Sequence, residues 1–112
     1  MAAVPSVNIV IPQGTDFSEV FTSTETDGSA SNLTGFTGNS EIRKYPGGTA
    51  YQSFSVSITG ATGEVSIAMT SGKTSLLKPG RHYYDVYLTS STGSVSRMVE
   101  GMAMVTAGIT TT

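Results

Sequence analysis

Few residues of this sequence carry groups suited to catalysis or metal binding. The chain has one histidine, His82, and no cysteine. His82 lies close enough in sequence to Asp85 and Glu100 to suggest a metal or proton-transfer site. A protein metal site, however, needs three or four converging ligands and partners that orient them. We therefore predict that His82 is a solvent-facing residue after a turn and that the protein uses no metal or other cofactor.

Two other patterns resemble parts of catalytic motifs. Several serines lie near acidic residues, but a nucleophilic serine needs an oriented base, and no Gly-x-Ser-x-Gly segment occurs. Gly72-Lys73-Thr74 matches the end of a phosphate-binding loop, yet Ile67 stands where that loop requires its first glycine. Pro79 also follows too soon for the long helix that such a loop precedes. These departures predict that the protein is not an enzyme.

The segment from Pro79 to Ala107 is predicted to form one long hairpin that reverses at Thr92-Gly93. The residues of its first strand alternate between an inward set and an outward set. The inward set is Tyr84, Val86 and Leu88, and the outward set is Tyr83, Asp85 and Tyr87. Tyrosine is enriched in protein interfaces, so the outward set is one half of a candidate interaction surface.

The returning strand supplies the other half of that surface. Its two alternating sets are Met98, Met102 and Met104, and Val99, Gly101, Ala103 and Val105. If the small residues face inward, the methionines lie outside, next to the tyrosines. The candidate intersubunit interface then consists of Tyr83, Tyr87, Met98, Met102 and Met104. The alternative is that Gly101 marks a β-bulge, which would shift the phase and bury some of these methionines.

Short alternating segments separated by turn signals fill the rest of the chain. They predict strands at 6–11, 16–23, 37–44, 50–58 and 64–69. A short helical turn within 71–78 is expected to insert Leu76 or Leu77 into the core. Loop or turn composition occupies 24–32 and 45–48. With the hairpin, this gives about seven strands at the spacing typical of an antiparallel β-sandwich, with a small closed barrel as the alternative.

Composition limits the classes of partner. A chain of 112 residues fits one domain, which we place at 1–112. Only 12% of the residues are charged and the net charge is −2, which argues against nucleic acid as a partner. No apolar run approaches the ~20 residues that cross a bilayer, and no secretory signal opens the sequence. We expect no membrane partner and synthesis in the cytoplasm.

The order of the turn and strand motifs resembles a known family. In chain order, these motifs are Gln13-Gly14-Thr15-Asp16-Phe17, Leu33-Thr34-Gly35-Phe36, Ile42-Arg43-Lys44, Gly60-Ala61-Thr62-Gly63, Val65-Ser66-Ile67, Leu77-Lys78-Pro79-Gly80, Tyr84-Asp85-Val86 and Arg97-Met98-Val99-Glu100-Gly101. Together they resemble the small immunoglobulin-like β-sandwich virion proteins of tailed bacteriophages. The chain is similar in particular to the amino-terminal domain of upper-baseplate proteins and to cyanophage virion structural proteins. The resemblance covers about residues 6–107 and implies an immunoglobulin-like fold.

The resemblance also implies a non-enzymatic structural role in the virion, in many copies. Upper-baseplate proteins continue into further domains whereas this sequence ends at Thr112, so we expect a capsid decoration or cement subunit. The expected partners are the major capsid protein, or neck or baseplate proteins, with homo-oligomers in the particle. One alternative is a neck or baseplate adaptor. Another is a host- or glycan-binding module, in which Tyr45, Tyr51 and Phe54 would form a concave aromatic surface.

Overall fold

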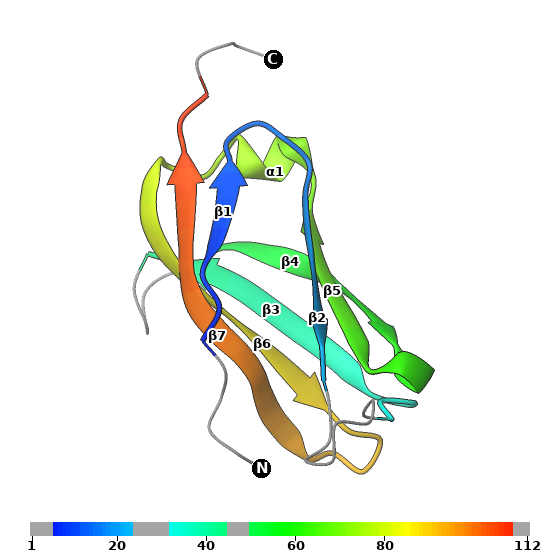
Figure 1. The fold of residues 1–112 in the computed structure, drawn as a ribbon. Helices are drawn as coiled ribbons and strands as arrows, with labels where there is room; N and C mark the ends of the chain where they lie inside the picture. Colours follow the sequence, from blue (N-terminus) through cyan, green and yellow to red (C-terminus); the bar gives the residue numbers. More distant parts are fainter. Residues whose placement is uncertain (1–5, 24–31, 45–49, 109–112) are drawn as a thin grey trace.

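The computed structural model describes residues 6–23, 32–44 and 50–108, and most of these residues lie in β-strands (Figure 1). The seven strands form one continuous sheet in the order β1-β7-β6-β3-β4-β5-β2. Their bounds are β1 Ile9–Pro12, β2 Phe17–Thr22, β3 Thr37–Arg43, β4 Ala50–Thr59, β5 Glu64–Met69, β6 Gly80–Thr89 and β7 Val95–Thr106. A 3₁₀ turn at Gly60–Thr62 joins β4 to β5, and α1, Ser71–Thr74, lies between β5 and β6. None of the described helical segments is long and apolar enough to span a membrane.

The sheet is divided into two parts at β4. The first half of β4, as far as Phe54, pairs with β3, and the second half, from Ser55, pairs with β5. The parts face one another, because the ring of Phe21 on β2 lies 6.4 Å from the ring of Tyr84 on β6. Phe17 on β2 likewise lies 6.0 Å from Phe54. The prediction of an all-β, sandwich-like fold is therefore confirmed. The helical turn expected within 71–78 is α1, and Gly60–Thr62 adds a second short turn.

Most strand pairs are antiparallel, but β1 runs parallel to β7 along the edge of the sheet. Before β1, the backbone of Val7 continues beside β7 and donates a hydrogen bond from its amide to the Glu100 carbonyl over 2.8 Å. The first predicted strand, 6–11, is therefore regular only from Ile9. The predicted loop at 24–32 and turn at 45–48 fall almost entirely outside the described residues.

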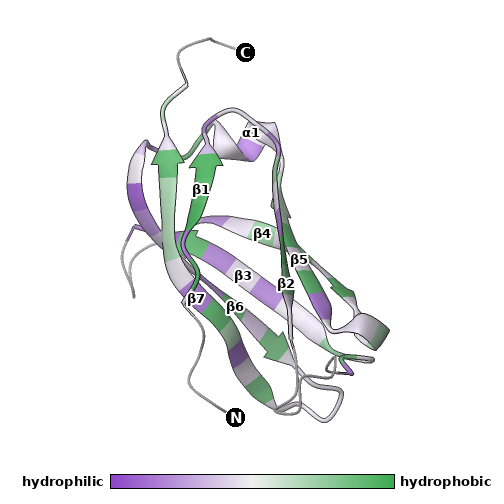
Figure 2. Ribbon diagram, viewed as in Figure 1, coloured by the Kyte–Doolittle hydropathy of each residue, from purple (hydrophilic) through white to green (hydrophobic). Residues whose placement is uncertain are grey.

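The core lies between the two parts of the sheet, and alternation explains its composition. Figure 2 shows apolar and polar bands following one another along β7. On β6, every second residue from His82 to Leu88 is buried, as the predicted inward set requires. The buried apolar residues are Ile9, Ile11, Phe17, Leu33, Ile42, Phe54, Val65, Ile67, Met69, Leu77, Tyr84, Val86, Leu88, Met98, Val99, Ala103 and Val105. Of the two candidates after α1, Leu77 is 1% exposed and enters the core, while Leu76 is 68% exposed.

The α1 turn connects the chain after β5 to the turn between β1 and β2. Thr74 is fully buried, and its hydroxyl donates to the Thr15 carbonyl over 2.7 Å and accepts from the Gly14 amide over 3.1 Å. The Gln13 side-chain amide donates to the Leu77 carbonyl over 2.8 Å. These bonds give the Gly-Lys-Thr sequence a structural role, because its threonine hydroxyl holds the neighbouring turn.

Candidate functional site

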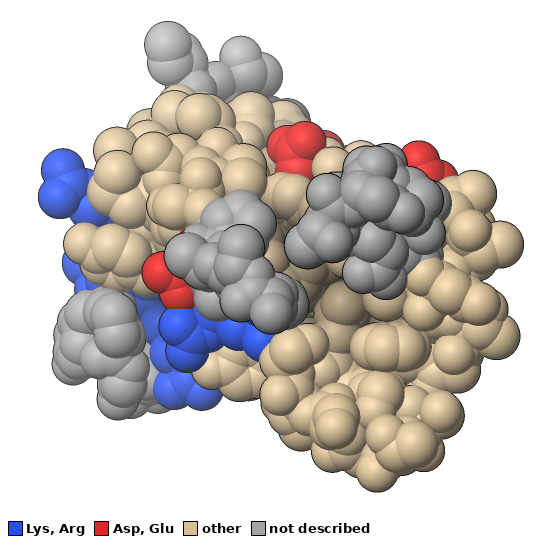
Figure 3. All heavy atoms as spheres, turned by 60° about the horizontal axis from the view of Figure 1, so that its bottom comes forward, with Lys and Arg blue, Asp and Glu red and all other residues tan. Residues whose placement is uncertain are grey.

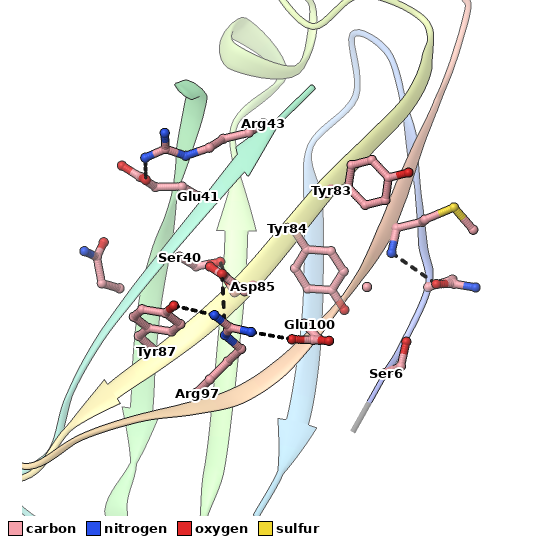
Figure 4. A pocket seen from close by; sticks show the side chains of 14 residues that line it. Ser6, Ser40, Glu41, Arg43, Tyr83, Tyr84, Asp85, Tyr87, Arg97 and Glu100 are labelled. Atoms are coloured by element: carbon pink, nitrogen blue, oxygen red, sulfur yellow. Dashed lines mark hydrogen bonds and ion pairs between the residues drawn. The ribbon is translucent and has the colours of Figure 1, made fainter. Parts of the chain in front are cut away.

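The outward side chains of β3, β6 and β7 line a cleft with a volume of about 930 Å³ (Figure 4). They lie in three cross-strand rows, because residues paired in register point to the same side of a sheet. We call this set the cleft face. Its rows are Arg43, Tyr83 and Met102; Glu41, Asp85 and Glu100; and Asn39, Tyr87 and Arg97.

The central strand of the cleft face is β6, and its alternation places the site. Tyr83, Asp85 and Tyr87 are half-buried and point outward, between the buried residues of the inward set. Figure 4 shows the two tyrosines on either side of Asp85 along this strand. The predicted outward set is therefore confirmed, and so is the place of Tyr83 and Tyr87 on one surface.

The methionines of β7 do not form the predicted outward stripe. Met98 is 8% exposed and Val99 is 2% exposed, so both consecutive residues belong to the core and the outward position of Met98 was wrong. The cause is a register shift: Val86 pairs with Val99, but Tyr87 pairs with Arg97, which leaves Met98 as the extra residue of a bulge. Met102 and Met104 come after the bulge, on the same face as Tyr83.

Gly101 has a different role from the bulge considered in the sequence. A Cβ atom at this position would overlap the carbonyl oxygen of Val7. The glycine therefore allows the segment 6–8 to lie directly against β7, where Ser6 and Asn8 line the cleft. The Tyr84 hydroxyl donates to the same Val7 carbonyl over 2.6 Å, and the Met102 amide donates to the Asn8 side chain over 3.1 Å.

Two arginines on the cleft face are bound by acidic neighbours. Arg97 donates to Glu100 over 2.6 Å and to the Tyr87 hydroxyl over 2.7 Å, and its guanidinium carbon lies 5.2 Å from the centre of the Tyr87 ring. Arg43 donates to Glu41 over 2.6 Å. Figure 3 shows basic side chains gathered at one side of the visible face beside an acidic one, further acidic side chains near the top, and uncharged residues over most of the rest.

Asp85 is the middle of three carboxylates that oppose one another directly across β3, β6 and β7. Its carboxylate lies 3.8 Å from the Arg97 side chain, a longer contact than the one between Arg97 and Glu100. Partial burial raises the pKa of Asp85, and the nearby charges of Glu41 and Glu100 add to this shift, while Arg97 and, more weakly, Arg43 oppose it. The shift shows that the surroundings of Asp85 disfavour its negative charge.

His82 is fully buried, so the prediction that it faces solvent was wrong. Its ring nitrogen Nε2 lies 2.7 Å from the Lys78 carbonyl oxygen. The position follows from strand alternation, because His82 has the same parity as Tyr84 and Val86. Among the residues that the structure describes, no group of three or more His, Cys, Asp or Glu side chains is arranged to hold a metal ion.

The aromatic surface considered for glycan binding does not form as described. Phe54 is buried in the core, 6.4 Å from the ring of Tyr84, and so cannot contribute to a surface. Tyr45 and the side chain of Tyr51 lie outside the described part of the chain. The concave surface found instead includes Glu41, Arg43 and Arg97, which sequence reasoning missed because it depends on the register between strands far apart in the chain.

No protein-family model and no curated sequence matches this chain. The membership in a phage virion family therefore stays a prediction that rests on the motif order given above.

Proposed function

We propose that this protein is a non-enzymatic structural subunit of a tailed-phage virion that docks on another virion protein through the cleft face. The observation that carries the proposal is the gathering of Tyr83, Tyr87, Met102 and Arg97 on one side of the sheet. Tyrosine, methionine and arginine are the residue types enriched in protein interfaces. Four of the five residues named as a candidate interface lie on this side of the sheet: Tyr83, Tyr87, Met102 and Met104, but not Met98.

An apolar patch adjoins the cleft face and enlarges the surface available for docking. Val10 on β1 pairs with Met104 on β7, and these side chains are 58% and 39% exposed. By contrast, outward positions of β4 and β5 carry serines such as Ser55, Ser57 and Ser66. Exposed apolar side chains next to tyrosines favour association, and a free monomer gains nothing from them.

Within the virion, we propose a capsid decoration or cement subunit. A capsid lattice repeats the same docking site many times, so a small contact with modest affinity is sufficient when many copies bind together. The neck or baseplate adaptor remains the alternative location. Copy number separates them: quantitative mass spectrometry of purified particles should give copies comparable in number to the major capsid protein, whereas a few copies per particle would indicate the neck or baseplate.

The test of docking is a double substitution on the apolar side of the face, Met102→Asp with Met104→Lys. We expect the variant to fold, as judged by circular dichroism, and to be lost from particles assembled in its presence, because charges replace the apolar contact. The matched control is Ser55→Asp with Ser57→Lys on the exposed face of β4, which should be incorporated normally. Normal incorporation of the folded methionine variant would contradict docking through this surface.

A further inference from the structure

We infer that the docking partner places a positively charged side chain, arginine or lysine, against Asp85 and the ring of Tyr83. This inference rests on the proposed docking function and adds the chemistry of the partner. Three features of the cleft face lead to it: the excess of carboxylates over guanidinium groups, the repulsion between the carboxylates of one row, and the aromatic side chains beside Asp85.

The charges of the cleft face do not balance. It holds three carboxylates and two guanidinium groups. Among the described residues, each arginine makes a 2.6 Å ion pair with a glutamate: Arg43 with Glu41 and Arg97 with Glu100. Asp85 has the longer 3.8 Å contact, and its side chain is 39% exposed. Among the nine residues of the cleft face the carboxylates therefore outnumber the guanidinium groups by one, and Asp85 is the carboxylate with the longest contact to an arginine. Arg81 lies outside this set, beyond Tyr83 on the same side of β6.

The carboxylate row brings like charges together on neighbouring strands. Like charges directly opposite one another on neighbouring strands destabilise a sheet. Glu41, Asp85 and Glu100 are such neighbours on three adjacent strands. The outward residues of β4 and β5 avoid this cost with serines, for example Ser57 opposite Ser66. A positively charged side chain from a partner would reduce this repulsion, so the row would favour the complex over the isolated protein.

The aromatic side chains favour a cation over a neutral group. The face of a tyrosine ring attracts ammonium and guanidinium groups, more strongly when water is excluded. Arg97 already lies 5.2 Å from the centre of the Tyr87 ring. Tyr83, on the other side of Asp85, also lines the cleft. A partner cation between Tyr83 and Asp85 would thus repeat the arrangement that Arg97 has with Tyr87.

An acidic partner fits this site less well. A phosphate or carboxylate would have to compete with Glu41 for Arg43 and with Glu100 for Arg97. It would also approach the charge of Asp85, which no basic residue contacts within 3 Å in the described part of the chain. Charge complementarity therefore points to a basic segment of the partner.

The experiment is an NMR titration of the folded protein with N-acetyl-arginine amide, with N-acetyl-citrulline amide as the uncharged probe of the same shape. We expect the arginine probe to shift the amide signals of β3, β6 and β7 around Asp85, and the citrulline probe to bind roughly tenfold more weakly or not at all. Asp85→Asn should weaken the arginine probe roughly tenfold as well. Glu64→Gln, an exposed carboxylate on β5, is the control and should bind like the original protein.

Equal shifts with both probes, or unchanged binding in Asp85→Asn, would overturn the inference. If Asp85→Asn does not fold, Tyr83→Leu serves as the second variant, with the same expected loss. A neutral oligosaccharide such as maltotriose that shifts these signals while the arginine probe does not would indicate a glycan ligand and also overturn it.

Particle incorporation separates this inference from the docking proposal. If Met102→Asp with Met104→Lys is lost from particles and Asp85→Asn is retained, docking through the cleft face is supported. The inference that Asp85 binds a basic side chain of the partner is then wrong. If both variants are incorporated normally, docking through the cleft face fails as well.

Discussion

At the scale of single residues, Tyr84 joins the core to the segment before β1. Its ring is buried and its hydroxyl donates to the Val7 carbonyl over 2.6 Å. Burial, and secondarily the charge of Glu19, raises the pKa of Tyr84 from 10.0 to about 12. The native state therefore holds this proton more tightly than the unfolded state does, which makes stability depend on alkaline pH.

Tyr84→Phe tests this residue. Below pH 10, the variant should be less stable by about 1 kcal/mol, because the Val7 carbonyl loses its hydrogen bond. As pH rises from 10.0 to about 12, the original protein should lose stability because Tyr84 resists ionisation in the native state. The variant has no hydroxyl at this position and should not show this loss. Urea unfolding at a series of pH values measures both effects. A constant difference between the two proteins across this range would contradict the role of Tyr84.

Asp85 gives a prediction of the opposite kind, in which removing a charge helps the isolated protein. Its pKa is raised above 3.8, so the native state binds this proton more tightly, and stability should fall as pH rises from below 3.8 through the raised pKa. Asp85→Asn removes that fall. Because the side chain is partly exposed, the gain at neutral pH should be below about 1 kcal/mol. Thermal unfolding of both proteins at acid and neutral pH checks it, and a less stable variant at neutral pH would contradict it.

At the scale of elements, the edge strand β1 and the segment before it depend on Gly101. Alanine there would overlap the Val7 carbonyl and push residues 6–8 away from β7, with loss of the bonds to Tyr84 and Glu100. We expect Gly101→Ala to cost about 1–3 kcal/mol in the free energy of unfolding. Hydrogen exchange should show faster exchange of the Val7 amide.

Gly72→Ala is the matched control for that substitution. A Cβ at position 72 meets no atom within 4 Å, and the residue lies in α1, where alanine is tolerated well. Its stability should be unchanged or slightly higher. If Gly101→Ala is as stable as Gly72→Ala, the close approach of β7 to residues 6–8 at Gly101 does not hold that segment in place.

The elements also show how far sequence reasoning reaches. Turn signals and alternation predict every strand to within a residue or two, apart from the later start of β1, and they assign the faces of β6 correctly from Tyr83 to Leu88. His82 was predicted to face solvent although its parity is that of the buried set. Alternation fails on β7 at Met98, because a bulge changes the phase and no local signal in the sequence marks its position. The glycine that suggested a bulge, Gly101, is instead needed for contact with a distant segment.

At the scale of the whole molecule, the cleft face is a product of topology. Its rows join β3 to the β6–β7 hairpin, which lies much later in the chain, while β4 and β5 continue into the other part of the sheet. The individual side chains are visible in the sequence, but the pairing of Glu41 with Asp85, and of Arg43 with Tyr83, depends on register. That is why Tyr83 and Tyr87 were predicted as interface residues while the charged residues around them were not.

Docking through the cleft face is the central claim, and an electron cryomicroscopy reconstruction of a particle that contains this protein tests it most directly. We predict density of a second virion protein against the outward side of β3, β6 and β7, covering Tyr83, Met102 and Met104. A reconstruction in which this side of the sheet faces solvent, while the subunit contacts the particle through β2, β4 or β5, would contradict the claim.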